Sequence, residues 1–378
     1  MHRVVVLGGG FGGIATAVAL RSHLEPADEV VLVERRPSFV MGLRKNWGLV
    51  GASTLAEGER PLAALGERGI EVVAGTIDAI RPGAHEAEVD GRTIAADALV
   101  VALGAERDPG RVPGFREHAI DVYDEGANET GAAAIDAFTG GRVVIGIFGV
   151  PYPCPPGPYE LALLLGERLA ARGVPGGIFV FTPQAGSLPV LGDAGCAAFD
   201  GRLASEGITL RPKTTATAVE PAAVVAADTR IPFDLLLGVP PHRVPEVVSA
   251  AGLAEPGAWV KVDPATLETR FPGVYAIGDV TAIPLASGMP LPKAGVFAHA
   301  QGEVVAARIA DQLAGRTPTA TFDGHGMCFL ETGHGRATMV RGNFYASPPD
   351  VALAEATEEH LAAKHAFETD RLAAWFGA

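Results

Sequence analysis

The sequence predicts an α/β protein with two parallel-sheet domains, the first split in the chain by insertion of the second, and a C-terminal α+β segment. Near the N-terminus, a glycine-rich turn follows a short apolar run in VVVLGGGFGG. Two more apolar runs, DALVVALG and GVYAIGD, lie far apart, and RVVIGIFG lies between them where a second sheet would begin. We expect a first domain over 1–112 and 246–320, a second domain over 113–245 and a C-terminal segment over 321–378.

Composition indicates a folded protein with a substantial core. Of the 378 residues, 48% are hydrophobic and 20% are charged. The 44 acidic residues outnumber the 30 basic ones, which gives a net charge of −14. Coulomb repulsion then disfavours binding to nucleic acid or to an anionic lipid surface. The sequence therefore predicts no nucleic-acid partner, although a basic protein partner would be tolerated.

Residues 4–20 carry no charge and follow Arg3, a pattern that is typical of signal peptides. Five of these residues are glycines that a nucleotide-binding turn would need, so we expect no cleavage here and a cytoplasmic protein. No other stretch has the long apolar run that a bilayer crossing requires. Peripheral membrane contact and a homodimer are both compatible with the sequence.

The N-terminal run predicts a strand over residues 4–7, a turn over 8–13 and a helix after the turn. Gly8 permits the turn, and Gly10 lets the backbone approach a pyrophosphate at the helix N-terminus. Gly13 allows the helix to pack closely on the strand.

A second strand over residues 29–33 ends at Glu34, where a carboxylate would hydrogen-bond an adenosine ribose. Strand, turn, helix, second strand and terminal acid together are typical of a Rossmann-like dinucleotide-binding domain. A purely structural glycine turn is the alternative, which the complete unit disfavours. The fingerprint alone does not separate FAD from NAD.

The runs over 97–104 and 273–279 resemble the ATG-like and GD motifs of the two-dinucleotide-binding-domain flavoproteins. The resemblance implies FAD in the first domain, with Asp279 reaching its ribityl chain or pyrophosphate. A helix N-cap is the alternative role for Asp279. The segment over 71–80 resembles the small meander inserted in this superfamily, which implies backbone contacts from Ile77 to the adenine.

Residues 296–313 have helical periodicity, and the positive end of this helix would point at the flavin. Lys293 and the helix dipole would together stabilise negative charge on the reduced ring. A solvated lysine at the start of a helix is the alternative. The cofactor residues that the fingerprint and the resemblance imply are Gly8, Gly10, Phe11, Gly12, Gly13, Glu34, Arg35, Ile77, Ala102, Gly104, Gly278, Asp279, Lys293 and Ala294.

The loop after the strand over 142–149 lacks the second glycine fingerprint that NADH-using relatives have. It reads VPYPCPPGP, and proline removes the backbone N–H groups that a pyrophosphate needs. The next strand, over 177–183, is followed by Gln184 and not by a ribose-binding acid. We therefore predict that this domain has the layered fold of an NAD domain but does not use NADH efficiently.

The run PYPCPPGPYE, followed by LALLLGERLAARG, resembles the flavoprotein subunit of flavocytochrome c sulfide dehydrogenase and, more broadly, sulfide:quinone oxidoreductases. The GMCFLETG segment around Cys328 agrees with this resemblance, which covers nearly the whole chain. It implies a redox-active pair, Cys154 and Cys328, with Glu160 as candidate proton acceptor. For Glu160, a first-turn helix acid favoured by the dipole is an equal alternative.

By this resemblance, hydrosulfide would attack a disulfide between the two cysteines, and electrons would pass through FAD to a quinone or cytochrome. We expect the head of the helix after Cys154 to lower the pKa of its thiol and make it reactive. An NADH-dependent quinone or persulfide reductase of the same superfamily and a flavin-bound redox sensor or scaffold are the alternatives.

The covalent flavin of the flavocytochromes needs a cysteine near residues 39–46, where this chain has none, so we expect noncovalent FAD. Cys196 lies outside both motif regions and is interpreted as a buried bystander. A metal cluster of Cys328 with His299, His325 and His334 is a minor alternative because a second thiolate is missing, so no metal is expected.

The segment over 321–378 predicts strands flanking GHGRATMVRGNFY and then a polar amphipathic helix that ends in Trp375 and Phe376. Such an aromatic end either dips into a membrane interface or packs on the first domain, and packing is the commoner outcome.

Overall fold

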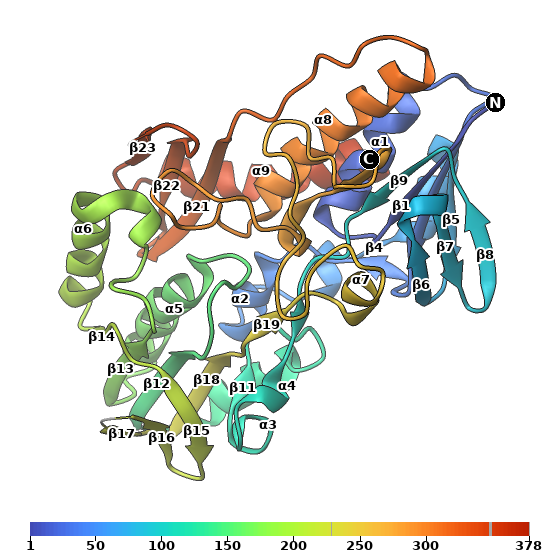
Figure 1. Cartoon of the computed structure of the whole chain (residues 1–378). Helices are drawn as coiled ribbons and strands as arrows, with labels where there is room; N and C mark the ends of the chain where they lie inside the picture. The colour runs from blue at the N-terminus through green and yellow to red at the C-terminus, as the bar shows by residue number, and fades with distance from the viewer. Residues whose placement is uncertain (228, 348–349, 378) are drawn as a thin grey trace.

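The computed structural model describes residues 1–227, 229–347 and 350–377. Its first sheet has the order β20-β9-β1-β2-β5 and is parallel throughout (Figure 1). The strands are β1 (Arg3–Leu7), β2 (Glu29–Glu34), β5 (Ile70–Ala74), β9 (Ala98–Val101) and β20 (Val274–Ala276). Because β20 joins the others from far along the chain, the predicted split of the first domain is confirmed.

The second sheet lies between β9 and β20 in the chain and has the order β11-β18-β12-β13-β14, again all parallel. Its strands are β11 (Ile120–Asp121), β12 (Gly141–Ile147), β13 (Gly176–Phe181), β14 (Thr209–Arg211) and β18 (Leu235–Val239). The predicted class, two Rossmann-like domains with the second inserted into the first, is therefore confirmed.

Burial on both faces explains why the central strands read as unbroken apolar runs. Val4, Val5, Val6 and Leu7 of β1 are all fully buried, as are the side chains of Leu99 to Val101 in β9. Each such side chain contributes about 1.5–3 kcal/mol through removal of apolar surface from water. The carboxyl ends of these strands consequently meet at one fixed edge of the sheet.

Two long helices, α1 (Phe11–His23) and α8 (Gly295–Leu313), pack against each other beside the first sheet (Figure 1). Gly302 allows their close approach, since an added Cβ there would lie 2.6 Å from Oγ1 of Thr16. Helix α1 begins at Phe11, earlier than the sequence predicts, because Gly10 already serves as its N-cap.

The second sheet carries α5 (Gly157–Ala171) and α6 (Gly192–Ser205). The shorter helices are α2 (Arg44–Leu49), α3 (Phe115–His118), α4 (Asn128–Ala137) and α7 (Glu246–Ala250). Two antiparallel three-stranded sheets complete the domains: β6 (Ile77–Arg81), β7 (Glu86–Val89) and β8 (Arg92–Ala95), and β15 (Ala216–Glu220), β16 (Ala223–Ala226) and β17 (Thr229–Pro232). The two-stranded pairs are β3 (Ser38–Phe39) with β4 (Arg60–Pro61), and β10 (Glu106–Arg107) with β19 (His242–Arg243).

The C-terminal segment forms an antiparallel sheet of β21 (His325–Gly333), β22 (Arg336–Asn343) and β23 (Asp350–Leu353), followed by α9 (Glu358–Phe376). GHGRATMVRGNFY was predicted to separate strands, but most of it is itself the strand β22. Trp375 is buried, so at this residue the helix end packs on the first domain. None of the helices in the described ranges has the length and apolar character needed to span a bilayer.

Candidate functional site

The glycine turn after β1 combines close packing with one open position. An added Cβ on Gly8 would lie 2.4 Å from the carbonyl oxygen of Ala102, and one on Gly13 would lie 1.8 Å from that of Gly8. Gly8 also has a φ of +109°, which L side chains rarely adopt. A Cβ on Gly10, in contrast, would meet no atom within 4 Å. The turn is therefore tightly packed at Gly8 and Gly13 and open at Gly10, at the N-terminus of α1.

Glu34 lies at the end of β2, where the sequence predicts it, and faces the glycine turn. Its Oε2 accepts a hydrogen bond of 2.8 Å from the backbone N–H of Gly9, and its Oε1 accepts one of 3.0 Å from that of Arg36. Burial raises the pKa of Glu34, but the charge of Arg36 and these hydrogen bonds outweigh burial and lower it. An ionised carboxylate is thus held at the edge of the turn.

The ends of β9 and β20 bring the two distant motifs to the same edge. Ala102 N–H donates to the carbonyl of Leu7 at 2.8 Å, and Gly278 N–H donates to Oε1 of Gln301 at 2.7 Å. Beyond these strands, an added Cβ on Gly104 would also meet no atom within 4 Å. Among the described residues, neither α1 nor α8 has a side-chain cap or an acidic residue in its first turn. Two uncapped helix N-termini can therefore offer N–H groups to an anionic ligand.

Lys293, just before α8, is buried, so its interpretation as a solvated lysine is wrong. Its Nζ donates to the carbonyl oxygens of Asp279 at 2.5 Å and Thr281 at 3.0 Å, and it lies 3.4 Å from the centre of the Trp259 ring. Burial lowers the pKa of Lys293 to about 8, although the Asp279 carboxylate partly opposes this. Burial likewise raises the pKa of Asp279, and the charge of Lys293 opposes that shift.

Cys154 lies in the loop between β12 and α5 and is tied by its backbone to the first domain. Its N–H donates to the carbonyl of Lys293 at 2.7 Å, and its own carbonyl accepts from the N–H of Gly157 at 2.8 Å. Its φ of +49° is in the left-handed region. The main chain therefore holds this cysteine next to the segment that enters α8.

Cys328 lies on β21, the strand that packs against α5, the helix that follows Cys154. Burial is the largest cause of the raised pKa of Cys328, and charge on Cys154 is the second. Both cysteines are free thiols. The two cysteines of the predicted pair thus lie close enough for a charge on Cys154 to affect the Cys328 thiol.

The prediction that the helix head lowers the pKa of Cys154 is wrong. Although Cys154 is an exposed residue, desolvation by the protein around its thiol, followed by the negative charge of Glu160, raises the pKa to about 11. The charge of Lys364 and the hydrogen bond from Gly157 N–H act in the opposite direction but are weaker. The thiol form is consequently favoured at neutral pH.

Glu160 is in the first turn of α5, as predicted, and is buried in a charge network that the sequence did not reveal. Its Oε2 accepts hydrogen bonds of 2.8 Å from Nζ of Lys364 and from the backbone N–H of Glu331. Its Oε1 accepts one of 3.0 Å from Nδ2 of Asn46.

Lys364, on α9, lies between two carboxylates. Its Nζ also donates to Oε1 of Glu331 at 2.8 Å, and Nε1 of Trp47 donates to the same oxygen. Burial lowers the pKa of Lys364, but Glu160 and Glu331 outweigh it and raise the pKa. One signal in the sequence could have found this lysine, because Lys364 and Glu368 lie on the same helical face as the buried Leu372 and Trp375.

Comparisons with known proteins agree with this arrangement. A profile of the pyridine nucleotide-disulphide oxidoreductase family matches residues 2–145. Over 332 residues the chain is 30% identical to a sulfide-quinone reductase of Aquifex aeolicus, which covers 82% of this chain and 76% of that protein. The chain belongs to the sulfide:quinone oxidoreductase family.

Two further likenesses extend over nearly the whole chain. It is 24% identical over 378 residues to the mitochondrial sulfide:quinone oxidoreductase of Mus musculus, covering 95% of this chain and 82% of that one. The X-ray structure of the Aquifex aeolicus sulfide:quinone oxidoreductase superposes with a TM-score of 0.90 at 25% identity, covering 100% of this chain and 92% of that one.

Sulfide:quinone oxidoreductases are FAD-dependent oxidoreductases, so the predicted enzyme class and cofactor are confirmed. The first domain fits FAD on its own geometry. The open position at Gly10 and the uncapped start of α1 suit a pyrophosphate, and the uncapped start of α8 suits the electron-rich edge of a flavin. Which atoms of FAD each residue would contact stays a prediction.

Phe11, predicted as a cofactor residue, directs its side chain into an aromatic cluster. Its ring centre lies 4.9 Å from that of Trp375 and 6.2 Å from that of Phe367, both on α9. An added Cβ on Gly295 would lie 2.9 Å from the Phe11 ring. The side chain therefore links the glycine turn to α8 and α9, and only the backbone of Phe11 remains for a cofactor.

The other predicted cofactor residues occupy less distinctive places. Arg35 is exposed, and its neighbour Arg36 makes the contacts with Glu34 instead. Ile77 begins β6, in the predicted meander, whereas residues 71–74 belong to the main sheet. Gly12 is buried in α1, and Ala294 is the N-cap of α8.

Cys196 is half-buried in α6, more open than a buried bystander. The three histidines of the alternative metal cluster have separate partners: His299 pairs with Glu303, His325 with Asp323, and His334 with Glu167 and Glu206. Within residues 1–227, 229–347 and 350–377, no three metal-ligating side chains come together.

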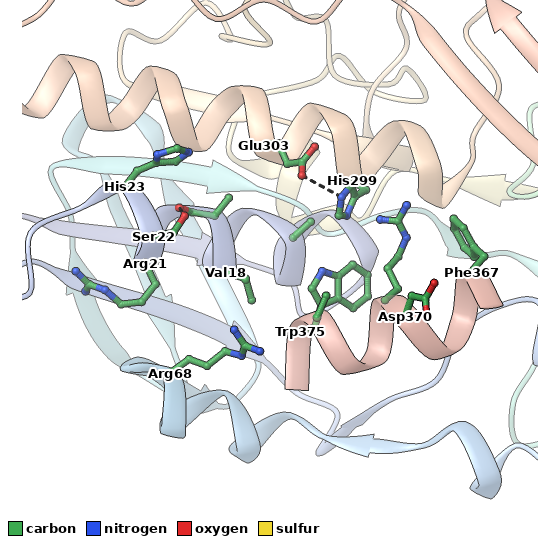
Figure 2. Close-up of a pocket in the computed structure, with 14 residues that line it drawn as sticks. Val18, Arg21, Ser22, His23, Arg68, His299, Glu303, Phe367, Asp370 and Trp375 are labelled. Atoms are coloured by element: carbon green, nitrogen blue, oxygen red, sulfur yellow. Dashed lines mark hydrogen bonds and ion pairs between the residues drawn. The ribbon is translucent and has the colours of Figure 1, made fainter. Parts of the chain in front are cut away.

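A groove of about 870 Å³ runs along α1 between α8 and α9 (Figure 2). Its walls include apolar side chains such as Val18, Phe367 and Trp375, and Arg21 and Arg68 lie at one end. Phe367 contacts β21, the strand that carries Cys328, since its ring centre lies 6.1 Å from that of Phe329. The groove thus combines apolar walls with charged side chains, since Glu303, Asp370 and Arg371 also line it, away from Arg21 and Arg68.

Proposed function

We propose that this protein oxidises sulfide at Cys154 and Cys328 and transfers two electrons through FAD to a quinone. Family membership supports the reaction, and one structural observation supports the residues. The strand that carries Cys328 packs against the helix that follows Cys154, and the Cys154 N–H donates to the Lys293 carbonyl just before α8. This backbone bond supports a place for Cys154 beside the proposed flavin site.

In the oxidised enzyme, Cys154 and Cys328 would form a disulfide. Hydrosulfide attacks one sulfur, an S–S bond forms to the incoming sulfur, and the original disulfide bond breaks. One cysteine then carries a persulfide and the other leaves as a thiolate. The sulfur atom of sulfide is oxidised by two electrons, and the cysteine pair holds those electrons.

FAD, when bound, supplies a two-electron acceptor that is then reoxidised by the quinone. The protein's part is to hold the redox pair and to balance charge. Glu160 is the proposed acceptor of the proton that hydrosulfide releases, and Lys364 holds its carboxylate in place at 2.8 Å. Glu160, Lys364 and Glu331 are all buried, so their charges are shielded from bulk water.

The proline loop supports sulfide over NADH as the electron donor. Pro155, Pro156 and Pro158 have no N–H groups, and the N–H of Gly157 already donates to the carbonyl of Cys154. This loop consequently offers no free cluster of donors to a second pyrophosphate.

For the quinone, the groove along α1 is the proposed approach. An apolar wall suits a hydrophobic acceptor, and Phe367 and Phe329 connect it to the Cys328 strand. A cytochrome as acceptor, a peripheral membrane contact, a homodimer and a cytoplasmic location stay predictions.

Stopped-flow mixing of the purified flavoprotein with sulfide, and separately with NADH, tests this proposal. We expect sulfide to bleach the flavin absorbance rapidly and a short-chain quinone to restore it, while NADH bleaches it far more slowly. Fast bleaching by NADH and none by sulfide would reject sulfide oxidation. Bleaching by sulfide without recovery on adding quinone would reject the acceptor.

A further inference from the structure

Cys154 adopts a backbone conformation that an L-amino acid with a side chain rarely adopts. Its φ of +49° lies in the left-handed region, which is strained for residues other than glycine, asparagine and aspartate. Such a conformation persists only where surrounding contacts hold it. The contacts on the Cys154 backbone therefore determine where the proposed reactive thiol lies.

Three hydrogen bonds hold the backbone N–H and carbonyl of Cys154, and one of them comes from a side chain. The N–H of Cys154 donates to Lys293 O at 2.7 Å, and its carbonyl accepts from Gly157 N–H at 2.8 Å. The same carbonyl accepts a bond of 3.0 Å from the phenolic hydroxyl of Tyr123. Tyr123 is not part of the redox pair or of the Glu160 network.

Tyr123 is itself fixed along its whole length. Its N–H donates to Oδ1 of Asp121 at 3.0 Å, and its carbonyl accepts from Nζ of Lys45 at 2.9 Å. Its ring centre lies 6.0 Å from that of His242, in an edge-to-face arrangement. These contacts direct the phenol towards the cysteine loop.

The phenol and the thiol share a space that only a glycine leaves open. A Cβ added to Gly157 would lie 3.0 Å from the Tyr123 hydroxyl oxygen and 3.4 Å from the Cys154 sulfur. Burial, followed by the charge of Cys154, raises the pKa of Tyr123 well above its ordinary value. The hydroxyl thus stays protonated and able to donate at any working pH.

We propose that Tyr123 is a positioning residue that holds the Cys154 carbonyl and so keeps the thiol in the orientation that the redox reaction needs. This inference rests on the proposed function. Tyr123 needs no contact with sulfide for this role, since it acts through the backbone of Cys154.

The test compares Tyr123→Phe with Tyr152→Phe. Tyr152 is a matched control because its hydroxyl donates to the carbonyl of Pro155 at 3.0 Å, in the same loop but not to Cys154. For Tyr123→Phe we expect flavin reduction by sulfide to slow by about 3- to 10-fold, the effect of one lost hydrogen bond. The flavin content and spectrum should match those of the wild type, and Tyr152→Phe should react at the wild-type rate.

A second readout does not depend on sulfide. Iodoacetamide labelling of Cys154, followed by peptide mass spectrometry, should become about threefold faster in Tyr123→Phe alone, because a released thiol gains solvent and forms thiolate more readily. Unchanged labelling and an unchanged sulfide rate would overturn the inference, as would equal effects in Tyr152→Phe. If the wild type does not react with sulfide, the proposed function fails, while labelling still decides the role of Tyr123.

Discussion

The loops after β1 and β12 occupy the same place, since each follows the third strand of a five-stranded parallel sheet and leads into a helix. The first loop is rich in glycine and leaves open space in front of Gly10. The second is rich in proline and places Cys154 in a left-handed conformation. The same position in two similar sheets therefore carries two loops of different backbone structure.

The difference lies in the backbone donors that each loop leaves free. Helix α1 begins without a side-chain cap among the described residues, so its first N–H groups can bind an anion. At the start of α5, the prolines have no N–H groups, and the N–H of Gly157 donates to the Cys154 carbonyl. At the second position the backbone therefore holds a cysteine where the first position offers N–H groups to an anion.

Replacing Cys154 gives the largest expected effect. Cys154→Ser removes the sulfur that the second loop holds, and a serine hydroxyl cannot form a disulfide. We expect flavin reduction by sulfide to fall by at least about 1,000-fold, as when an essential nucleophile is removed. Stopped-flow absorbance measures the rate, and the half-buried Cys196→Ser is the control. A fall in the rate of less than tenfold would show that Cys154 does not take part in sulfide oxidation.

Removing the charge on Lys364 tests how much its buried ion pairs with Glu160 and Glu331 stabilise the protein. Lys364→Met leaves the carboxylates of Glu160 and Glu331 buried without their shared cation. Loss of one partner of a buried ion pair costs about 3–5 kcal/mol, so the free energy of unfolding should fall by that amount. Urea unfolding measures it, and exposed Lys261→Met should leave it unchanged. A loss below about 1 kcal/mol would contradict a structural role for this network.

The two loops also differ in how far the sequence predicts them. The glycine turn, Glu34 and the split sheet follow from local patterns, because each glycine role depends on neighbours within one strand-turn-helix unit. The helix start was wrong by three residues, since Gly10 already has the extended backbone of an N-cap. Sequence patterns predict this loop because the residues that form it lie close together in the chain.

Around Cys154, long-range contacts decide the chemistry. The helix-head rule predicts a lowered thiol pKa, but burial and the Glu160 charge raise it to about 11. Lys364 was missed because both of its carboxylate partners, Glu160 and Glu331, come from other segments of the chain. Tyr123 was missed for the same reason, since its hydroxyl bonds the carbonyl of a residue in another loop.

The pH dependence of the free energy of unfolding tests the surroundings of the second loop. Burial lowers the pKa of His242 to about 4 from an ordinary value of 6.5, although the hydrogen bond to the Pro240 carbonyl opposes it, and the charge of Arg107 adds to the shift. Between these values the unfolded chain binds a proton that the native protein does not bind. Stability is therefore fully present above about pH 6.5 and falls as the pH falls towards 4, by at most about 3 kcal/mol.

His242→Gln should remove this part of the acid dependence and leave stability at pH 8 within about 1 kcal/mol of the wild type. Urea unfolding at several values of pH between 4 and 8 measures the slope. His23→Gln, at an exposed position at the end of α1, should keep the wild-type slope. Equal slopes in His242→Gln and the wild type would mean that this histidine is not held neutral.

The smallest expected effect is at the open position of the first loop. Gly10→Ala should not disturb the fold, because Gly10 has a φ of −85° and its added Cβ would meet no atom within 4 Å. If that space admits the FAD pyrophosphate, the methyl group would weaken FAD binding about tenfold, or about 1.4 kcal/mol. Fluorescence titration of the apoprotein with FAD measures the affinity. Gly66→Ala is the control, since its added Cβ also meets no atom within 4 Å and Gly66 is not part of the turn over residues 8–13. Equal FAD affinity in both variants would place the cofactor elsewhere and remove the contrast between the two loops.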